Sequence, residues 1–86
     1  MEDNLENFQQ IKAIIDRWDP VDLGWFPDDE YTVEIKQIIE AYHEIGDNVE
    51  GLGDAIEEVL VRNFGRNVFI KDILECRQIA EKIILL

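Results

Sequence analysis

Apolar residues recur every three or four positions in four segments of this chain, a spacing that places their side chains on one face of an α-helix. The segments run from Leu5 to Trp18, from Ile35 to Ile45, from Val49 to Phe64, and over residues 70–85. No segment alternates apolar and polar residues for long enough to predict a β-strand. We therefore expect an all-α fold in which four main helices pack their apolar faces together.

The length of the chain limits how many cores it can build. With 86 residues, we expect a single helical domain, residues 1–86. A chain of this size buries only about 60–65% of its unfolded surface, so one small core is the expected result. The predicted core residues are Phe8, Ile11, Ile15, Trp18, Ile35, Ile38, Ile39, Tyr42, Leu52, Ile56, Val59, Leu60, Ile73, Cys76, Ala80 and Ile83.

Residues that cap or break helices mark the ends of the segments. Short polar side chains are expected to cap the first turns of three of them. These caps are Asn4, Asn48 and, for the last segment, either Asn67 or Asp72. Asp19-Pro20, Gly46 and Gly65 are expected to end the first three segments, because a proline disfavours a helical residue before it and a glycine readily adopts the left-handed conformation.

Two glycines, Gly51 and Gly53, lie inside the third segment. Each costs about 1 kcal/mol relative to alanine in a helix interior. Two interpretations stay open: the glycines allow another helix to approach closely, or they simply weaken the first turn.

The connection over residues 19–31 combines aromatic residues with acids. A short helical turn is expected at residues 20–24, because Asp19 can cap it and Pro20 suits its first position. Aromatic residues surrounded by charge are typical of protein interfaces, although a small domain also needs its large residues in the core. Both interpretations stay open. The candidate partner surface consists of Asp19, Asp22, Trp25, Asp28, Asp29 and Glu30.

Several short motifs carry a resemblance that spans nearly the whole chain. They are Trp18-Asp19-Pro20, Pro27-Asp28-Asp29-Glu30-Tyr31, Glu34-Ile35, Phe64-Gly65 and the set Cys76, Ala80 and Ile83. On these residues the chain resembles the YugE-like family of small bacillary proteins of unknown function. Thr32 departs from the pattern, since an acidic residue is expected there. The resemblance implies a compact all-helical domain and implies no activity.

The charge of the chain is negative and unevenly distributed. With 8 Lys and Arg against 20 Asp and Glu, the net charge is −12. Residues 1–61 hold 3 basic and 17 acidic residues, a net of −14, and residues 62–86 hold 5 basic and 3 acidic residues, a net of +2. Nucleic acid and anionic membrane surfaces are poor partners for such a chain, because binding them requires lysine and arginine.

A basic protein is the partner that this charge favours, because opposite charges steer association. Two alternatives stay open. In the first, the acids only form a solvated surface. In the second, the basic end of one copy meets the acidic face of another. We expect a monomer or a weak homo-oligomer.

The residue types that carry most catalytic chemistry are scarce. The chain has no serine, one histidine (His43) and one cysteine (Cys76), and it lacks a glycine-rich phosphate loop. A serine nucleophile, an internal disulfide and a thiolate zinc site are therefore excluded within it. Cys76 lies on the apolar stripe of the last segment and is expected to be a buried structural thiol. We expect no enzymatic activity and no cofactor.

A cytoplasmic location is expected because a single cysteine suits a reducing compartment. The acidic N-terminal residues, which lack the apolar stretch of a signal peptide, favour the same location.

One set of side chains has the spacing of a metal site. Glu40, His43, Glu44 and Asp47 would share one face of a continuous helix. One histidine with flexible carboxylates is no zinc signature, and Gly46 is expected to end the helix before Asp47. We therefore favour a solvated face and predict no metal site. Overall, we expect a non-enzymatic protein-interaction module, and the alternative is a metal- or small-molecule-binding protein that uses its carboxylate-rich face.

Overall fold

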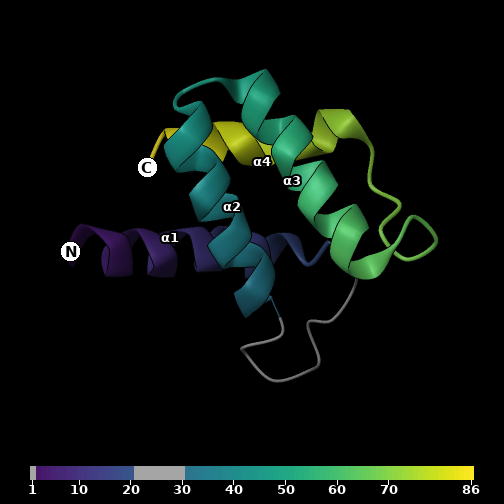
Figure 1. The fold of residues 1–86 in the computed structure, drawn as a ribbon, viewed down its shortest axis with the longest axis horizontal. Coiled ribbons are helices and arrows are strands. Elements are labelled where there is room, and N and C mark those ends of the chain that lie inside the picture. Colours follow the sequence, from purple (N-terminus) through teal and green to yellow (C-terminus); the bar gives the residue numbers. More distant parts are fainter. Residues whose placement is uncertain (1, 21–30) are drawn as a thin grey trace.

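The computed structural model describes residues 2–20 and 31–86, and within these residues the chain forms four helices and no strand (Figure 1). The helices are α1 (Glu2–Trp18), α2 (Thr32–Ile45), α3 (Val49–Phe64) and α4 (Ile73–Ile84). The predicted all-α fold of four main helices is confirmed. The short helical turn predicted for residues 20–24 falls, apart from Pro20, outside the described residues.

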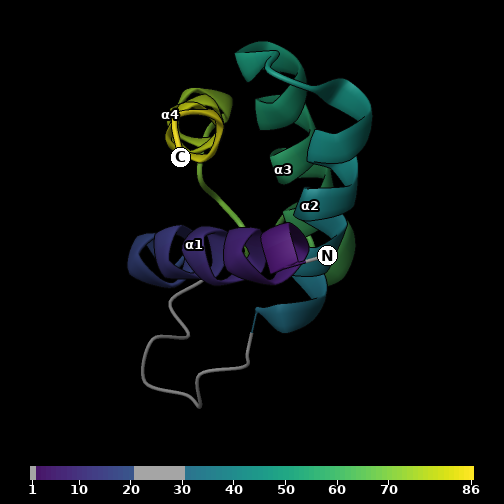
Figure 2. The same ribbon diagram turned by 90° about the vertical axis from the view of Figure 1, so that its left-hand side faces the viewer.

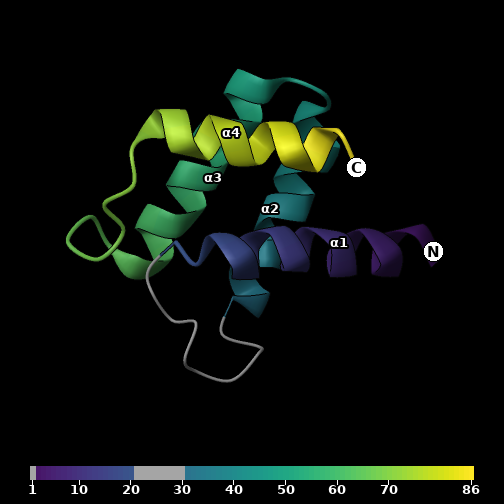
Figure 3. The ribbon, with the colours of Figure 1, turned by 180° about the vertical axis from the view of Figure 1, so that it is seen from behind.

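The helices pack as a closed ring in which each one contacts two others. α2 and α3 lie side by side and run in opposite directions, whereas α4 crosses behind them (Figure 1). Seen from behind, α1 and α4 both lie in front of the α2–α3 pair (Figure 3). α1 packs on α2 and α4, and α3 packs on α2 and, most extensively, on α4. Figure 2, which looks along α4, shows α1 and α4 one above the other.

The core fills the space that this ring encloses. The predicted core residues that are buried are Ile11, Ile15, Ile35, Ile38, Leu52, Ile56, Val59, Leu60, Cys76, Ala80 and Ile83. The remaining predicted residues pack against this core while partly buried, and they are Phe8, Trp18, Ile39, Tyr42 and Ile73. The predicted core omitted Tyr31, Phe69 and Ile79, which are also buried. Tyr31 and Phe69 lie just outside helices, so helical periodicity gives no information on their burial.

Four of the predicted helix boundaries follow from local capping. Gly46 and Gly65 end α2 and α3 with φ angles of 77° and 85°. Asn48 caps α3, since its Oδ1 accepts a hydrogen bond of 3.0 Å from the Gly51 backbone N–H. Asp72 caps α4, since its Oδ1 accepts a hydrogen bond of 2.9 Å from the Glu75 N–H.

The alternative cap for α4, Asn67, lies in the turn that precedes it. The prediction that Asn4 caps α1 is wrong. The helix already begins at Glu2, so Asn4 lies inside it.

At Gly53, α3 approaches α4 too closely to leave room for a side chain. A Cβ atom at this position would lie 2.9 Å from the Cα of Arg77 on α4 and 2.6 Å from its Cγ. Backbone atoms cannot give way at such distances, so the α3–α4 contact requires glycine here. At Gly51, a Cβ would meet only side-chain atoms, with Asn48 Nδ2 and Ile45 Cγ2 both at 3.1 Å. Of the two interpretations of these glycines, close helix approach is therefore correct for Gly53.

We expect Gly53→Ala to lower the free energy of unfolding by about 1–3 kcal/mol, because the added methyl forces α3 and α4 apart. Gly51→Ala is the matched control. The side chains around Gly51 can shift and alanine has the better helix propensity, so its effect is expected to stay within about 1 kcal/mol. Urea unfolding of both variants measures the difference. A Gly53→Ala variant as stable as the wild type would show that the helices do not need this close contact.

Candidate functional site

Asp19 is the one residue of the predicted acidic and aromatic partner surface that lies within residues 2–20 and 31–86. Its φ angle is 50°, and its Oδ1 accepts a hydrogen bond of 2.8 Å from the Tyr31 hydroxyl. Asp19 therefore joins the two ends of the first connection, beside the buried Pro20. The other predicted residues fall outside the described part of the chain, and they are Asp22, Trp25, Asp28, Asp29 and Glu30.

The two described aromatic residues that flank this connection contribute to the packing of the fold. The Tyr31 side chain is only 3% exposed and meets the Phe64 ring edge-on at a centroid distance of 6.1 Å. Trp18 is half-buried, and its ring is nearly perpendicular to that of Phe69 at 6.0 Å. The Trp18 indole Nε1–H donates a hydrogen bond of 2.6 Å to Glu75 Oε2. The Trp18–Glu75 hydrogen bond attaches the end of α1 to the first turn of α4, and the Tyr31–Phe64 contact joins the start of α2 to the end of α3.

The acidic set around His43 does not share one helix face. α2 ends at Ile45, so Asp47 lies beyond the helix, and its Oδ1 accepts a hydrogen bond of 3.0 Å from the Tyr42 hydroxyl. Burial raises the pKa of Tyr42, and the hydrogen bond and negative charge of Asp47 raise it further. In the part of the chain that the structure describes, no three His, Cys, Asp or Glu side chains gather as a metal site would require.

A shallow hollow between α2 and α3, which we call the acidic hollow, brings together Glu40 and Glu44 from α2 with Glu58 from α3. Its volume is about 220 Å³, and all three glutamates are exposed. Arg62 also lines it, but no Lys or Arg among the described residues forms an ion pair with any of the three glutamates. The spacing of Glu40 and Glu44 was visible in the sequence, whereas their proximity to Glu58 depends on how α2 and α3 pair.

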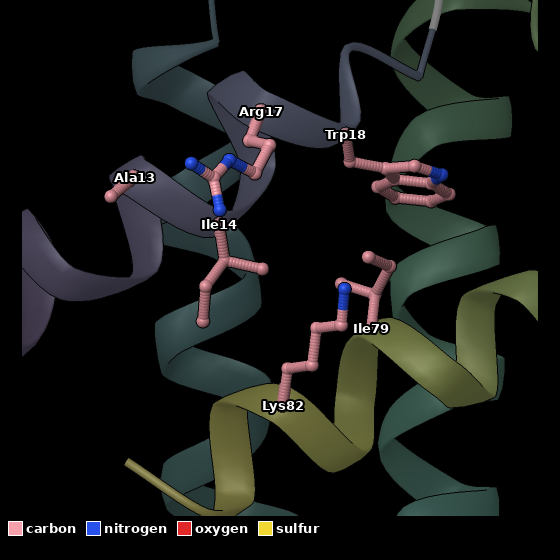
Figure 4. A pocket seen from close by; sticks show the side chains of 6 residues that line it. All are labelled: Ala13, Ile14, Arg17, Trp18, Ile79 and Lys82. Carbon is pink, nitrogen blue, oxygen red and sulfur yellow. The ribbon is translucent and has the colours of Figure 1, made fainter.

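A larger hollow, which we call the α1–α4 groove, lies between these two helices and has a volume of about 750 Å³ (Figure 4). Its lining is apolar apart from two cations, and it consists of Ala13, Ile14, Arg17, Trp18, Ile79 and Lys82. Figure 4 shows the Arg17 and Lys82 side chains extending from opposite helices towards the space between them. Sequence reasoning missed this groove, because its residues come from the two ends of the chain and share no local spacing.

Cys76 lies in the core, with 0% of its surface exposed. Burial raises the pKa of its thiol to about 12, and the negative charges of nearby carboxylates, chiefly Glu57 and Glu75, add to this effect. The thiol therefore keeps its proton at neutral pH and does not form the thiolate, which is the reactive form of cysteine. Its burial agrees with the structural role that the sequence predicted.

We expect the wild-type chain to lose stability as the pH rises from 9 towards 12, because the thiol ionises near 9 when unfolded and near 12 when folded. The stabilisation is complete below the lower value and disappears as the pH approaches the higher one. Between roughly pH 8 and pH 10, the wild type is expected to lose about 1 kcal/mol more than Cys76→Ala, which has no thiol. Urea unfolding at both pH values measures this difference. Identical pH dependence in the two proteins would contradict the raised pKa.

Comparison with known proteins identifies a family for most of the chain. Residues 10–86 match the sequence model of a domain of unknown function (DUF1871). No match was found among curated proteins or among solved structures. None of the helices in residues 2–20 and 31–86 has the length and hydrophobicity needed to cross a membrane.

Proposed function

We propose, from its charge and geometry, that this chain, which belongs to the DUF1871 family (a domain of unknown function), is a non-enzymatic protein-interaction module. The partner is a basic protein, and the acidic hollow between α2 and α3 is part of the surface that contacts it. Within the family, we group the chain with the YugE-like proteins on its shared motifs. We further propose that it acts in the cytoplasm, as a monomer or weak homo-oligomer.

The observation that carries this proposal is the exposure of six carboxylates on α2, α3 and their connection, three of which line the acidic hollow. The exposed acids of these helices and their connection are Glu40, Glu44, Asp47, Glu50, Asp54 and Glu58. Among the described residues, Asp54 is the one member of this group with an ion-pair partner, Arg77 Nη2 at 3.6 Å. Carboxylates that lie close together and are not neutralised by ion pairs repel one another, and a basic partner would relieve this repulsion.

The shape of the acidic hollow favours a protein surface over a small molecule. Its volume of about 220 Å³ is below the range of roughly 300–1,000 Å³ that is typical of small-molecule sites. A shallow hollow with charged walls suits long basic side chains, since a lysine or arginine can reach several carboxylates from a neighbouring surface.

Removing charge from the hollow tests this proposal. We expect Glu44→Gln/Glu58→Gln to weaken partner binding about tenfold, because both carboxylates face the hollow. Glu81→Lys on α4 is the control, since it also raises the net charge by two but lies outside the hollow, and its effect is expected to stay within about threefold.

The partner is first captured from a lysate of the source organism at about 50 mM salt, and the capture is expected to weaken at about 300 mM. Isothermal titration with the purified partner then compares the three proteins. Capture of no basic protein at low salt, or an equal loss of affinity in the Glu81→Lys control, would contradict the proposal.

A further inference from the structure

The α1–α4 groove differs in charge from the rest of this acidic protein. The two charged residues that line it, Arg17 and Lys82, are both basic, although the chain has a net charge of −12. Among residues 8–20 and 31–86, whose side chains the structure describes, neither Arg17 nor Lys82 forms an ion pair with a carboxylate. Because the two cations extend from opposite helices towards the same space (Figure 4), an anion between them would relieve their mutual repulsion.

Two carboxylates that line a hollow beside the groove already have structural partners. A smaller hollow of about 390 Å³ adjoins the groove at Trp18, Ile79 and Lys82, and it is lined by Asp72 and Glu75. Asp72 caps α4, and Glu75 accepts the hydrogen bond from the Trp18 indole. Asp72 therefore serves the start of α4, and Glu75 serves the packing of α1 against α4. Neither forms an ion pair with Arg17 or Lys82, which stay available to a ligand.

The walls of the groove are apolar and well supported. Ile14 and Trp18 come from α1, and Ile79 comes from α4. The orientation of the Trp18 ring is set by its hydrogen bond to Glu75 and its edge contact with Phe69, so this wall exists before any ligand binds. The volume of about 750 Å³ lies within the range of roughly 300–1,000 Å³ that is typical of small-molecule sites.

We propose that the α1–α4 groove binds an amphipathic organic carboxylate. Its carboxylate lies between Arg17 and Lys82, and its apolar body lies against Ile14, Trp18 and Ile79. A guanidinium group matches a carboxylate through two parallel hydrogen bonds. The negative field of the whole chain disfavours ligands with several negative charges, so a single carboxylate on an apolar body fits better than a nucleotide. This inference does not depend on the proposed protein partner.

Nuclear magnetic resonance titration of the full-length ¹⁵N-labelled chain with hexanoate, octanoate and decanoate tests the proposal directly. We expect saturable shifts of amide signals from residues 13–18 and 79–82, which form the two sides of the groove. The affinity should rise with each pair of added methylenes, by at most about fourfold per methylene. Octanoate should bind at least about fivefold more tightly than the neutral 1-octanol, because only the carboxylate interacts with the two cations.

A matched pair of double variants locates the binding site. Arg17→Gln/Lys82→Gln is expected to lower octanoate affinity about tenfold. Arg62→Gln/Arg66→Gln removes the same amount of positive charge from exposed positions outside the groove and is expected to change the affinity by less than about twofold. Circular dichroism melting confirms that both variants fold. Should the first variant fail to fold, the ligand series on the wild type still decides the outcome.

Several results would overturn this proposal. They are the absence of saturable shifts at millimolar octanoate, equal affinity for octanoate and 1-octanol, and an equal loss of affinity in the two double variants. Shifts centred on the exposed Ile70 and Leu74 would place apolar binding elsewhere. If an acidic amphipathic peptide shifted the groove amides while the carboxylates did not, the groove would be a protein-docking site instead. None of these results bears on the acidic hollow, whose glutamates lie on α2 and α3.

Discussion

The close contact between α3 and α4 at Gly53 is the constraint on which the rest of the arrangement depends. The Arg77 backbone comes so near to Gly53 that a single methyl group would not fit between them. This approach makes α3–α4 the most extensive helix contact in the described structure. It also sets the position of α4. This helix provides the second wall of the groove through Ile79 and Lys82, and its Glu75 accepts the hydrogen bond from Trp18 on α1.

Trp18 links this packing to the candidate groove. Its indole N–H joins the end of α1 to Glu75 on α4 and so closes the ring of helices. The Trp18 side chain also forms part of the groove wall. A small domain has few large side chains, so one residue often serves both the core and a surface site. The sequence predicted Trp18 as a core residue, and the structure shows that it packs against the core while half-buried, with its indole N–H hydrogen-bonded to Glu75.

The uneven charge of the sequence has a more specific form in three dimensions. The acidic part of the chain contributes the hollow between α2 and α3. The slightly basic final segment does not form a uniform positive face, because Arg77 lies near Asp54 and Lys82 extends towards Arg17. Arg17 belongs to the part of the sequence with a net charge of −14, but in the structure it lines the same groove as Lys82 from the slightly basic final segment. The charge of a sequence segment therefore does not give the charge of the surface that its residues form.

The sequence by itself determined the four helices, most of the core and the ends marked by Gly46, Asn48 and Gly65. These features depend on local spacing and capping, which neighbouring residues set. Only the tertiary structure decided that Gly53 allows close packing, that Phe69 and Tyr31 are buried, and that the two walls of the α1–α4 groove face each other. The physical reason is that these features depend on how helices cross, and crossing geometry arises from the mutual fit of side chains far apart in the chain.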